Sequence, residues 1–242
     1  MIEIVKATRD GLQTIHDMAQ VVFRHTYRDI LSPEQMEYMM DMMYSLPNLR
    51  AQLDEGHHYY IAYMSPDQES STHQESSTHQ EDTAPHEDGA PGRCNDVASS
   101  DDSASAVCNA RDSILPVPCG YVSVQHEGPD QDGTEIFHLH KIYVMPEAQG
   151  RGVGMRLFQT VVQHVKSVLQ VRSAGDGASA IINPELATAQ SATAKARIEL
   201  NVNKFNSAVN FYKHLGMRIL LEEDFPIGNG FYKTDYIMGL DI

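Results

Sequence analysis

The sequence contains no tryptophan and only three cysteines among its 242 residues. Cys94, Cys108 and Cys119 have none of the spacings that bind zinc, so we expect a reducing compartment and no metal site. No apolar run is long enough to span a bilayer, and the N-terminal residues MIEIVKATRDG lack the pattern of a secretory signal peptide. These absences predict a cytoplasmic protein without a membrane partner.

Positive charge is also scarce in this chain. Lysine and arginine number 18 against 33 aspartates and glutamates, which gives a formal net charge of −15. This balance argues against nucleic acid or an anionic membrane as the main partner, and it is compatible with a cationic amine substrate. Residues 65–113 carry eleven carboxylates against two arginines, or −9, so −15 less −9 leaves −6 for the rest of the chain. The acidic argument for a cationic substrate is correspondingly weaker.

Two segments are poor in large apolar residues. Residues 66–113 are rich in Ser, Asp, Glu and Gln and contain the hexapeptide QESSTH twice in succession. Such a composition cannot bury enough apolar surface to offset the entropy lost on ordering. We therefore predict a disordered acidic insert at 66–113 and a flexible insert, rich in Ala, Ser, Gly and Thr, at 172–195. Both interrupt a single domain that spans residues 1–242.

Outside these segments, the hydrophobic pattern changes repeatedly between strand and helix periods. Residues 32–35 read Ser-Pro-Glu-Gln, a helix-start signal with proline at the first helical position. The next helix carries Met36, Met39, Met40 and Met43, which fit core packing or the wall of a pocket for a flexible alkyl chain. The expected strands are 2–8, 58–64, 117–126, 135–144, 196–202, 217–224 and 231–240, and the expected helices begin near 12, 33, 47, 153 and 206. The predicted fold class is α/β (α+β), a mixed and mostly antiparallel sheet flanked by helices.

The central stretch, Glu135 to Leu169, combines a strand, a glycine-containing turn and an amphipathic helix. The turn reads Gln149-Gly150-Arg151-Gly152-Val153-Gly154. Glycines let a phosphate approach the main chain, the helix start offers unpaired N–H groups, and Arg151 and Arg156 add positive charge. Alternation over 135–144 predicts one strand face with Ile136, His138, His140 and Ile142, and another with Phe137, Leu139, Lys141 and Tyr143.

Two common phosphate-binding patterns are absent from this turn. A Walker loop needs a lysine that the turn lacks, and a Gly-x-Gly-x-x-Gly fingerprint would need glycine where the chain has Met155 or Leu157. The pattern present is Gln-x-x-Gly-x-Gly after a strand. An ordinary tight turn between strand and helix is the alternative explanation.

The Gln-x-x-Gly-x-Gly turn resembles motif A of the GNAT superfamily of acyl-CoA-dependent N-acetyltransferases. Residues 206–217 (NSAVNFYKHLGM) resemble motif B of the same superfamily, with Met217 in place of the usual aromatic residue. Asn206 is a plausible N-cap of a short helix, and Gly216 a plausible C′ residue. The resemblance implies acetyl-CoA as co-substrate, no metal, and coenzyme contacts at Ile142, Tyr143, Val144, Gln149, Gly150, Arg151, Gly152, Val153, Gly154 and Asn206.

Amide formation needs a deprotonated amine and a protonated leaving thiolate. Tyr212 matches the motif B tyrosine, which implies the role of general acid, since a phenol stays protonated at neutral pH; simple packing is the alternative. His138 and His140 precede the coenzyme segment and look like the histidine pair of arylalkylamine-type acetyltransferases. They are the candidate general bases, with His140 slightly favoured. Three alternatives stay open: the histidines have a structural role, a glutamate on this strand is the base, or water alone accepts the proton.

The closing segment, residues 224–238, resembles the ends of bacterial polyamine and small-amine acetyltransferases. Asp224, Asp235, Tyr232 and Glu199 either help to recognise a cationic acceptor there or are rim residues. We predict acetyl transfer from acetyl-CoA to a primary amine, a small or polyamine-like acceptor, by direct attack in a ternary complex. A protein or peptide acceptor and a non-catalytic acyl-CoA-binding regulator are the alternatives. A homodimer is compatible with the resemblance.

Overall fold

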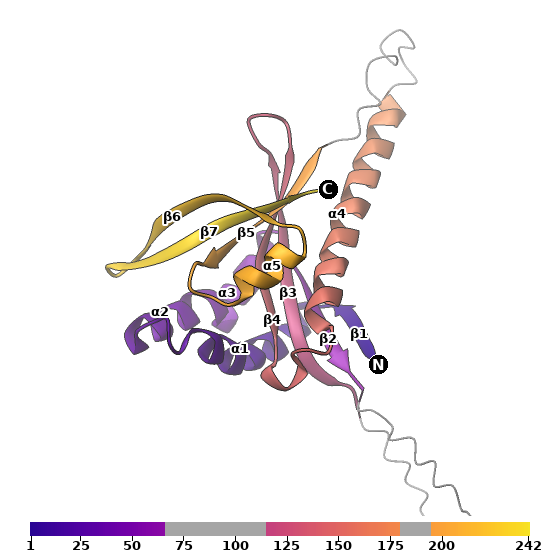
Figure 1. Ribbon diagram of the computed structural model, residues 1–242. Helices are drawn as coiled ribbons and strands as arrows, with labels where there is room; N and C mark the ends of the chain where they lie inside the picture. The colour runs from indigo at the N-terminus through magenta and orange to yellow at the C-terminus, as the bar shows by residue number, and fades with distance from the viewer. Residues whose placement is uncertain (66–114, 180–194) are drawn as a thin grey trace, which may run out of the picture. The chain divides into compact units, whose positions relative to one another are not determined.

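The structure is a computed structural model that describes residues 1–65, 115–179 and 195–242, with only the backbone given for 172–179. Its centre is a seven-stranded sheet in the order β1-β2-β3-β4-β5-β7-β6 (Figure 1). The strands are β1 (Ile2–Lys6), β2 (His58–Met64), β3 (Val117–Pro129), β4 (Glu135–Val144), β5 (Ala196–Asn203), β6 (Arg218–Gly228) and β7 (Phe231–Asp241).

Neighbouring strands are antiparallel except β4 and β5, which are parallel. The predicted mixed, mostly antiparallel sheet is therefore confirmed. β4 and β5 pair only through Glu135–His138 and Ala196–Glu199. Beyond these residues the C-terminal half of β4 has no partner on its β5 side among the described strands, so a row of main-chain polar groups is left free there.

The helices lie on both faces of the sheet. Figure 1 shows α1, α2 and α3 gathered on one face and α4 along the other, with the short α5 near β5. Their bounds are α1 (Leu12–Tyr27), α2 (Pro33–Tyr44), α3 (Leu46–Asp54), α4 (Val153–Ser179) and α5 (Ala208–His214), and single 3₁₀ turns occupy Arg9–Gly11 and Pro146–Ala148.

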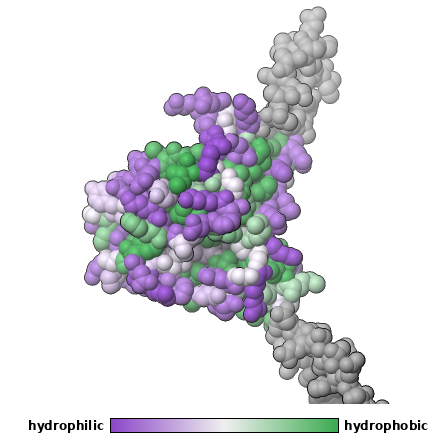
Figure 2. Space-filling view, in the orientation of Figure 1, coloured by the Kyte–Doolittle hydropathy of each residue, from purple (hydrophilic) through white to green (hydrophobic). Residues whose placement is uncertain are grey.

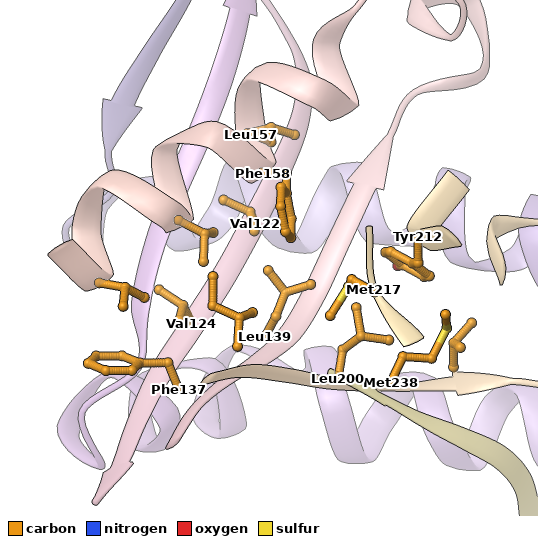
Figure 3. Close-up of a cluster of buried hydrophobic side chains, with 14 of the residues drawn as sticks. Val122, Val124, Phe137, Leu139, Leu157, Phe158, Leu200, Tyr212, Met217 and Met238 are labelled. Atoms are coloured by element: carbon orange, nitrogen blue, oxygen red, sulfur yellow. The ribbon is translucent and has the colours of Figure 1, made fainter. Parts of the chain in front are cut away.

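Each face of the sheet has its own hydrophobic core. The core under α4 and α5 joins β3, β4 and β5 to α4 through residues such as Val122, Leu139, Leu157, Phe158 and Leu200 (Figure 3). The other core packs α1, α2 and α3 on β2 and β3 around Phe23, Met40, Tyr44, Tyr59 and Tyr121. Full burial of each such side chain contributes about 1.5–3 kcal/mol. The two cores hold β4, which carries the candidate site, from both sides.

A β-bulge at His140 corrects the expected faces of β4. Leu139 pairs with Val124 and Lys141 pairs with Ser123, so His140 is an extra residue in the ladder. One extra residue shifts the alternation that follows it. The α4 side receives Phe137, Leu139, Ile142 and Val144, and the α1–α2 side receives His138, His140, Lys141 and Tyr143. Alternation predicted Ile142 on the same face as the histidines and Lys141 and Tyr143 on the opposite face. Both predictions were wrong.

Two helix boundaries also differ from expectation. The N-cap of α5 is Ser207 rather than Asn206, although the Asn206 Oδ1 accepts a hydrogen bond from the Ala208 N–H at 2.9 Å. Gly216, with φ of 88°, does follow the helix end as expected. α4 continues to Ser179, into the first part of the segment expected to be a flexible insert. The rest of that segment, and the predicted insert at 66–113, lie outside the described residues.

The face of the molecule seen in Figure 2 carries hydrophilic residues with smaller hydrophobic patches between them. Some of the exposed apolar side chains lie on β6, including Ile219 and Leu221. Within the described part of the chain, no helix combines the length and the apolar character needed to cross a membrane.

Candidate active site

Two glycines in the left-handed conformation shape the turn between β4 and α4. Gly150 has φ of 74° and Gly152 has φ of 80°, a region that residues with side chains seldom adopt. Nothing lies within 4 Å of the place where a β-carbon would stand at either glycine. The main chain is therefore open directly before the first turn of α4, where N–H groups lack helical partners. This geometry suits the oxygens of a diphosphate.

The turn is attached to β4 at one end and to α5 at the other. The Gln149 side-chain amide donates to the Val144 carbonyl oxygen at 3.2 Å. A β-carbon at Gly154 would lie 3.3 Å from the Phe211 ring, so glycine lets α4 approach α5 closely. Gly150 and Gly152 thus serve the shape of the turn, whereas Gly154 serves packing.

A first cavity of about 410 Å³ opens where β4 and β5 diverge. Its walls come from the second half of β4, the glycine turn, the start of α4, α5, and parts of α1 and β5. It is lined by nearly all the predicted coenzyme-binding residues, namely Ile142, Tyr143, Val144, Gln149, Gly150, Gly152, Val153, Gly154 and Asn206. The volume is in the range of small-molecule sites.

The two arginines of the turn do not line this cavity. Arg151 is exposed, and its guanidinium lies 3.9 Å from the Met64 sulfur. The exposed Arg156 donates to the Ile2 carbonyl oxygen at 2.9 Å. At the glycine turn, positive charge therefore comes from main-chain N–H groups rather than from these guanidinium groups.

Tyr212 projects from α5 into the core beside the first cavity, where Figure 3 shows it next to Met217. Its side chain is buried, and burial raises its pKa well above the usual value, with a smaller contribution from Tyr27. The hydroxyl is therefore a neutral proton donor at physiological pH. Asn206 stands at the start of the same segment and donates from Nδ2 to the Tyr27 hydroxyl at 3.4 Å.

A second cavity, also of about 410 Å³, lies on the α1–α2 side of β4. Met39 and Met43 line it, and Met36, Met39 and Met40 belong to the core, so Met39 serves both of the expected uses. Residues that line both cavities are Tyr27, His140, Lys141, Tyr143 and Asn201. The bulge in β4 is thus part of the wall that the two cavities share.

Three imidazoles pack in a row beside this wall. The His140 ring centroid lies 4.2 Å from that of His57 and 4.5 Å from that of His138. Burial lowers the pKa of His57 and of His138 to about 4, and it lowers the pKa of His140 to about 2 with help from the neighbouring His138. All three are neutral at pH 7. They belong to no group of metal-binding side chains within the described residues.

Hydrogen bonds fix which nitrogen of His140 carries the proton. The Gln125 amide donates from Nε2 to the Glu55 carbonyl oxygen at 2.8 Å, so its Oε1 is directed to His140 Nε2 at 3.0 Å. His140 Nε2 must therefore carry the hydrogen and donate it. The free lone pair is on Nδ1, which can accept a hydrogen bond from an amine.

Lys141 is a buried cation in the same wall. It is 4 % exposed, and its Nζ donates to Gln52 Oε1 at 2.8 Å. Burial, with a smaller effect of the Lys233 ammonium, lowers its pKa to about 7. The sequence does show a lysine inside a strand that is otherwise mostly apolar, which could have marked Lys141 as a functional residue. Simple alternation along the strand, however, placed its side chain on the wrong face.

The other acceptor candidates are mostly away from the second cavity. Asp224 and Tyr232 are exposed on the β6–β7 hairpin, and Glu199 pairs with Arg197 at 3.4 Å. Asp235 does line the cavity, and burial raises its pKa while Lys233 partly opposes the shift. Sequence reasoning missed His57 and Gln125, which contact His140 from other segments, and Asn201, which lines both cavities.

Residues 103–218, somewhat less than half of the chain, match the family described as "Acetyltransferase (GNAT) domain". No curated protein matches the sequence. Among solved structures, the chain is similar to the PaiA N-acetyltransferase of Thermoplasma acidophilum in complex with coenzyme A, with a TM-score of 0.54, 16 % identity, and coverage of 100 % of this chain and 99 % of that one.

Two further structures show the same fold. A GNAT-family acetyltransferase from Staphylococcus aureus has a TM-score of 0.51 and 12 % identity over 100 % of this chain and 99 % of that one. Arabidopsis thaliana NAA60 in complex with a bisubstrate analogue has a TM-score of 0.51 and 12 % identity over 100 % and 98 %. Residues 103–218 thus match a GNAT acetyltransferase domain, and the chain shares the fold of these solved N-acetyltransferases. Sequence identities of 12–16 % show a shared fold and do not identify the acceptor substrate.

Proposed function

We propose that this protein transfers the acetyl group of acetyl-CoA to the primary amine of a small acceptor. The observation that carries the proposal is the meeting of two cavities at the β4 bulge, one bordered by the glycine turn and the other by three neutral imidazoles. A thioester in the first cavity and an amine in the second would meet beside His140, Lys141 and Tyr143, which line both cavities. Direct attack within one ternary complex fits this arrangement.

The first cavity would hold the coenzyme by its main chain. The open turn at Gly150 and Gly152 would receive the diphosphate through N–H groups at the start of α4. The free edge of β4 at residues 142–144 would pair with the amide groups of the pantetheine arm. Such pairing adds an extended ligand to a sheet as another strand would be added.

Proton movements can be assigned to groups at the shared wall. The amine nitrogen bonds to the thioester carbon as its proton passes to His140 Nδ1, directly or through water, with His138 next in the row. The C–S bond then breaks, and the Tyr212 hydroxyl donates its proton to the leaving sulfur. The proton released by the amine restores the tyrosine, so protons balance over one turnover. Because both histidine pKa values are low, the imidazoles would pass the proton on rather than retain it.

Contacts between α2 and the β6–β7 hairpin favour a small acceptor over a protein or peptide. The Tyr38 hydroxyl donates to the Ile227 carbonyl oxygen at 2.6 Å, and the Gln35 side chain donates to the Tyr232 carbonyl oxygen at 2.8 Å. Both elements contribute residues to the second cavity. These bonds hold the hairpin against α2, which restricts a long polypeptide more than a compact amine.

The experiment combines coenzyme binding with turnover. We expect calorimetry to show binding of acetyl-CoA, and Gly152→Ala to weaken it roughly tenfold or more, since a β-carbon would strain the turn and crowd the phosphates. Gly133→Ala is the matched control, because Gly133 has φ of 77° in an exposed hairpin turn. Thiol release with a panel of amines then tests transfer. Tight binding without turnover on any amine or peptide would instead indicate an acyl-CoA-binding regulator.

A further inference from the structure

Among the charged side chains that line the second cavity, Lys141 has no carboxylate partner in the described part of the chain. Lys141 and Lys233 both line it, and Asp235 is the one carboxylate among the described residues that do so. Asp235 Oδ2 lies 3.3 Å from Lys233 Nζ, so these two groups neutralise each other. No described carboxylate forms an ion pair with Lys141, whose partner at 2.8 Å is the neutral amide of Gln52.

The surroundings of Lys141 hold its ammonium in place without cancelling its charge. Its Nζ lies 5.7 Å from the centre of the Tyr44 ring and 5.6 Å from that of Tyr59, and aromatic faces attract cations. An ammonium has three donors, and Gln52 is the acceptor that the described residues provide. A buried ammonium with unused donors at a cavity wall is suited to bind an anion.

The remaining titratable side chains of the cavity do not compete for this role. His57, His138 and His140 are neutral at pH 7 because they are buried. They can accept a hydrogen bond from an amine that enters beside them, but they neither attract nor neutralise an anion. The wall therefore combines neutral acceptors for an amine with one amino group, that of Lys141, that has no carboxylate partner among the described residues.

We propose that the acceptor carries a carboxylate on the same small molecule as its primary amine, and that Lys141 Nζ binds this carboxylate. This inference rests on the proposed acetyl transfer and names its substrate class as an amino acid-like zwitterion. A diamine would instead place a second ammonium near Lys141, where repulsion is not offset by a free carboxylate. Lys141 is thus a specificity-determining residue that sits next to the candidate base His140 in the bulge.

The test compares three matched acceptors at each of several chain lengths: an amino acid, its carboxamide and the corresponding diamine, for example β-alanine, β-alanine amide and diaminopropane. Binding is measured by calorimetry on the CoA-saturated protein, and turnover by thiol release from acetyl-CoA. We expect the carboxylate form to be favoured by roughly tenfold or more in kcat/KM. Lys141→Met should raise KM for the amino acid roughly tenfold more than it raises KM for the amide. Lys141→Arg should retain the preference.

Lys166→Met is the control for loss of one positive charge, since Lys166 is exposed on α4. Preference for the diamine or equal use of all three acceptors would overturn the inference. So would binding of none of them to the CoA-loaded protein, or a Lys141→Met variant with lower kcat on every acceptor and unchanged KM, which would indicate a chemical role. If Lys141→Met does not fold, the wild-type preference and Lys141→Arg decide. Failure to bind CoA at all would instead refute the proposed function.

Discussion

The hydroxyl of Tyr212 combines two properties that a general acid requires. Burial raises its pKa, so the hydroxyl keeps its proton at physiological pH and is available as a donor to the leaving sulfur. At the same time its ring belongs to the core under α4, together with Met217 and Leu200 (Figure 3). Packing fixes the position of the ring, and the hydroxyl can act without being exposed to bulk water.

Tyr212→Phe should separate these two properties, because it removes the hydroxyl and keeps the ring. We expect kcat to fall roughly 10²–10⁴-fold while the Kd for acetyl-CoA is unchanged. Steady-state thiol release and calorimetry measure the two quantities. Tyr232→Phe, at an exposed position, should leave both unchanged. A Tyr212→Phe variant with normal kcat would limit Tyr212 to packing.

His138 links the site to the pH dependence of stability. Its pKa is about 4 in the folded protein and about 6.5 when unfolded, so the unfolded chain binds more protons between these values. The unfolding free energy is therefore highest above about pH 6.5 and falls as the pH is lowered toward 4. The wild-type protein should lose unfolding free energy between pH 7 and pH 5. We expect His138→Gln to make this loss smaller by about 2 kcal/mol.

Urea unfolding of both proteins at the two pH values measures this difference. His25→Gln, at an exposed position on α1, is the control for the loss of a histidine elsewhere in the chain. An identical pH dependence in wild type and His138→Gln would show that the imidazole is not buried in its neutral form.

At the scale of elements, local patterns predicted most of the fold. The capping signal at Ser32 is confirmed by a hydrogen bond of 3.2 Å from the Gln35 N–H to the Ser32 Oγ, and the expected strands all appear. These features depend on neighbouring residues, which a single sequence displays. The glycine turn was also recognisable, because Gln149–Gly154 stand between a strand pattern and a helix pattern.

The faces of β4 could not be predicted in the same way. The bulge at His140 arises from pairing with β3, and alternation within β4 gives no sign of it. As a result Lys141 was assigned away from the histidines. The partners His57 and Gln125 lie on other segments, and only the folded sheet brings them to His140.

The contact between α4 and α5 offers a test of how the first cavity is held together. Gly154→Val should place methyl groups against Phe211, which is 3.3 Å from the β-carbon position. We expect a loss of stability of about 1–3 kcal/mol from overpacking, with weaker acetyl-CoA binding as α5 is displaced. Thermal unfolding and calorimetry check both effects.

A double mutant supplies the control for this prediction. Phe211→Leu makes room at the same contact, so adding it to Gly154→Val should restore part of the lost stability, with a coupling free energy of about 0.5 kcal/mol or more. Additive effects of the two substitutions would show that the β-carbon clash is not the cause.

At the scale of the whole molecule, β4 connects the two halves of the proposed reaction. Its first residues pair with β5 and complete the sheet, and its later residues leave β5 and border both cavities. The two cores hold this single strand from opposite faces. Parts of the chain that do not support β4, the glycine turn or the α2 cover should therefore be dispensable for catalysis.

We predict that residues 66–113, which lie outside the described residues, are such a part. β2 ends and β3 begins with Met64 paired to Val117, so the two chain ends that flank the segment already lie side by side in the sheet. Replacing 66–113 with Asn-Gly should leave kcat and both KM values within about twofold, and the shorter connection lowers the entropy cost of loop closure by up to about 2 kcal/mol. Circular dichroism, thermal unfolding and thiol release measure the outcome. An Asn-Gly variant that fails to fold, or that folds but loses acceptor affinity, would mean that this acidic segment supports the domain or its substrate.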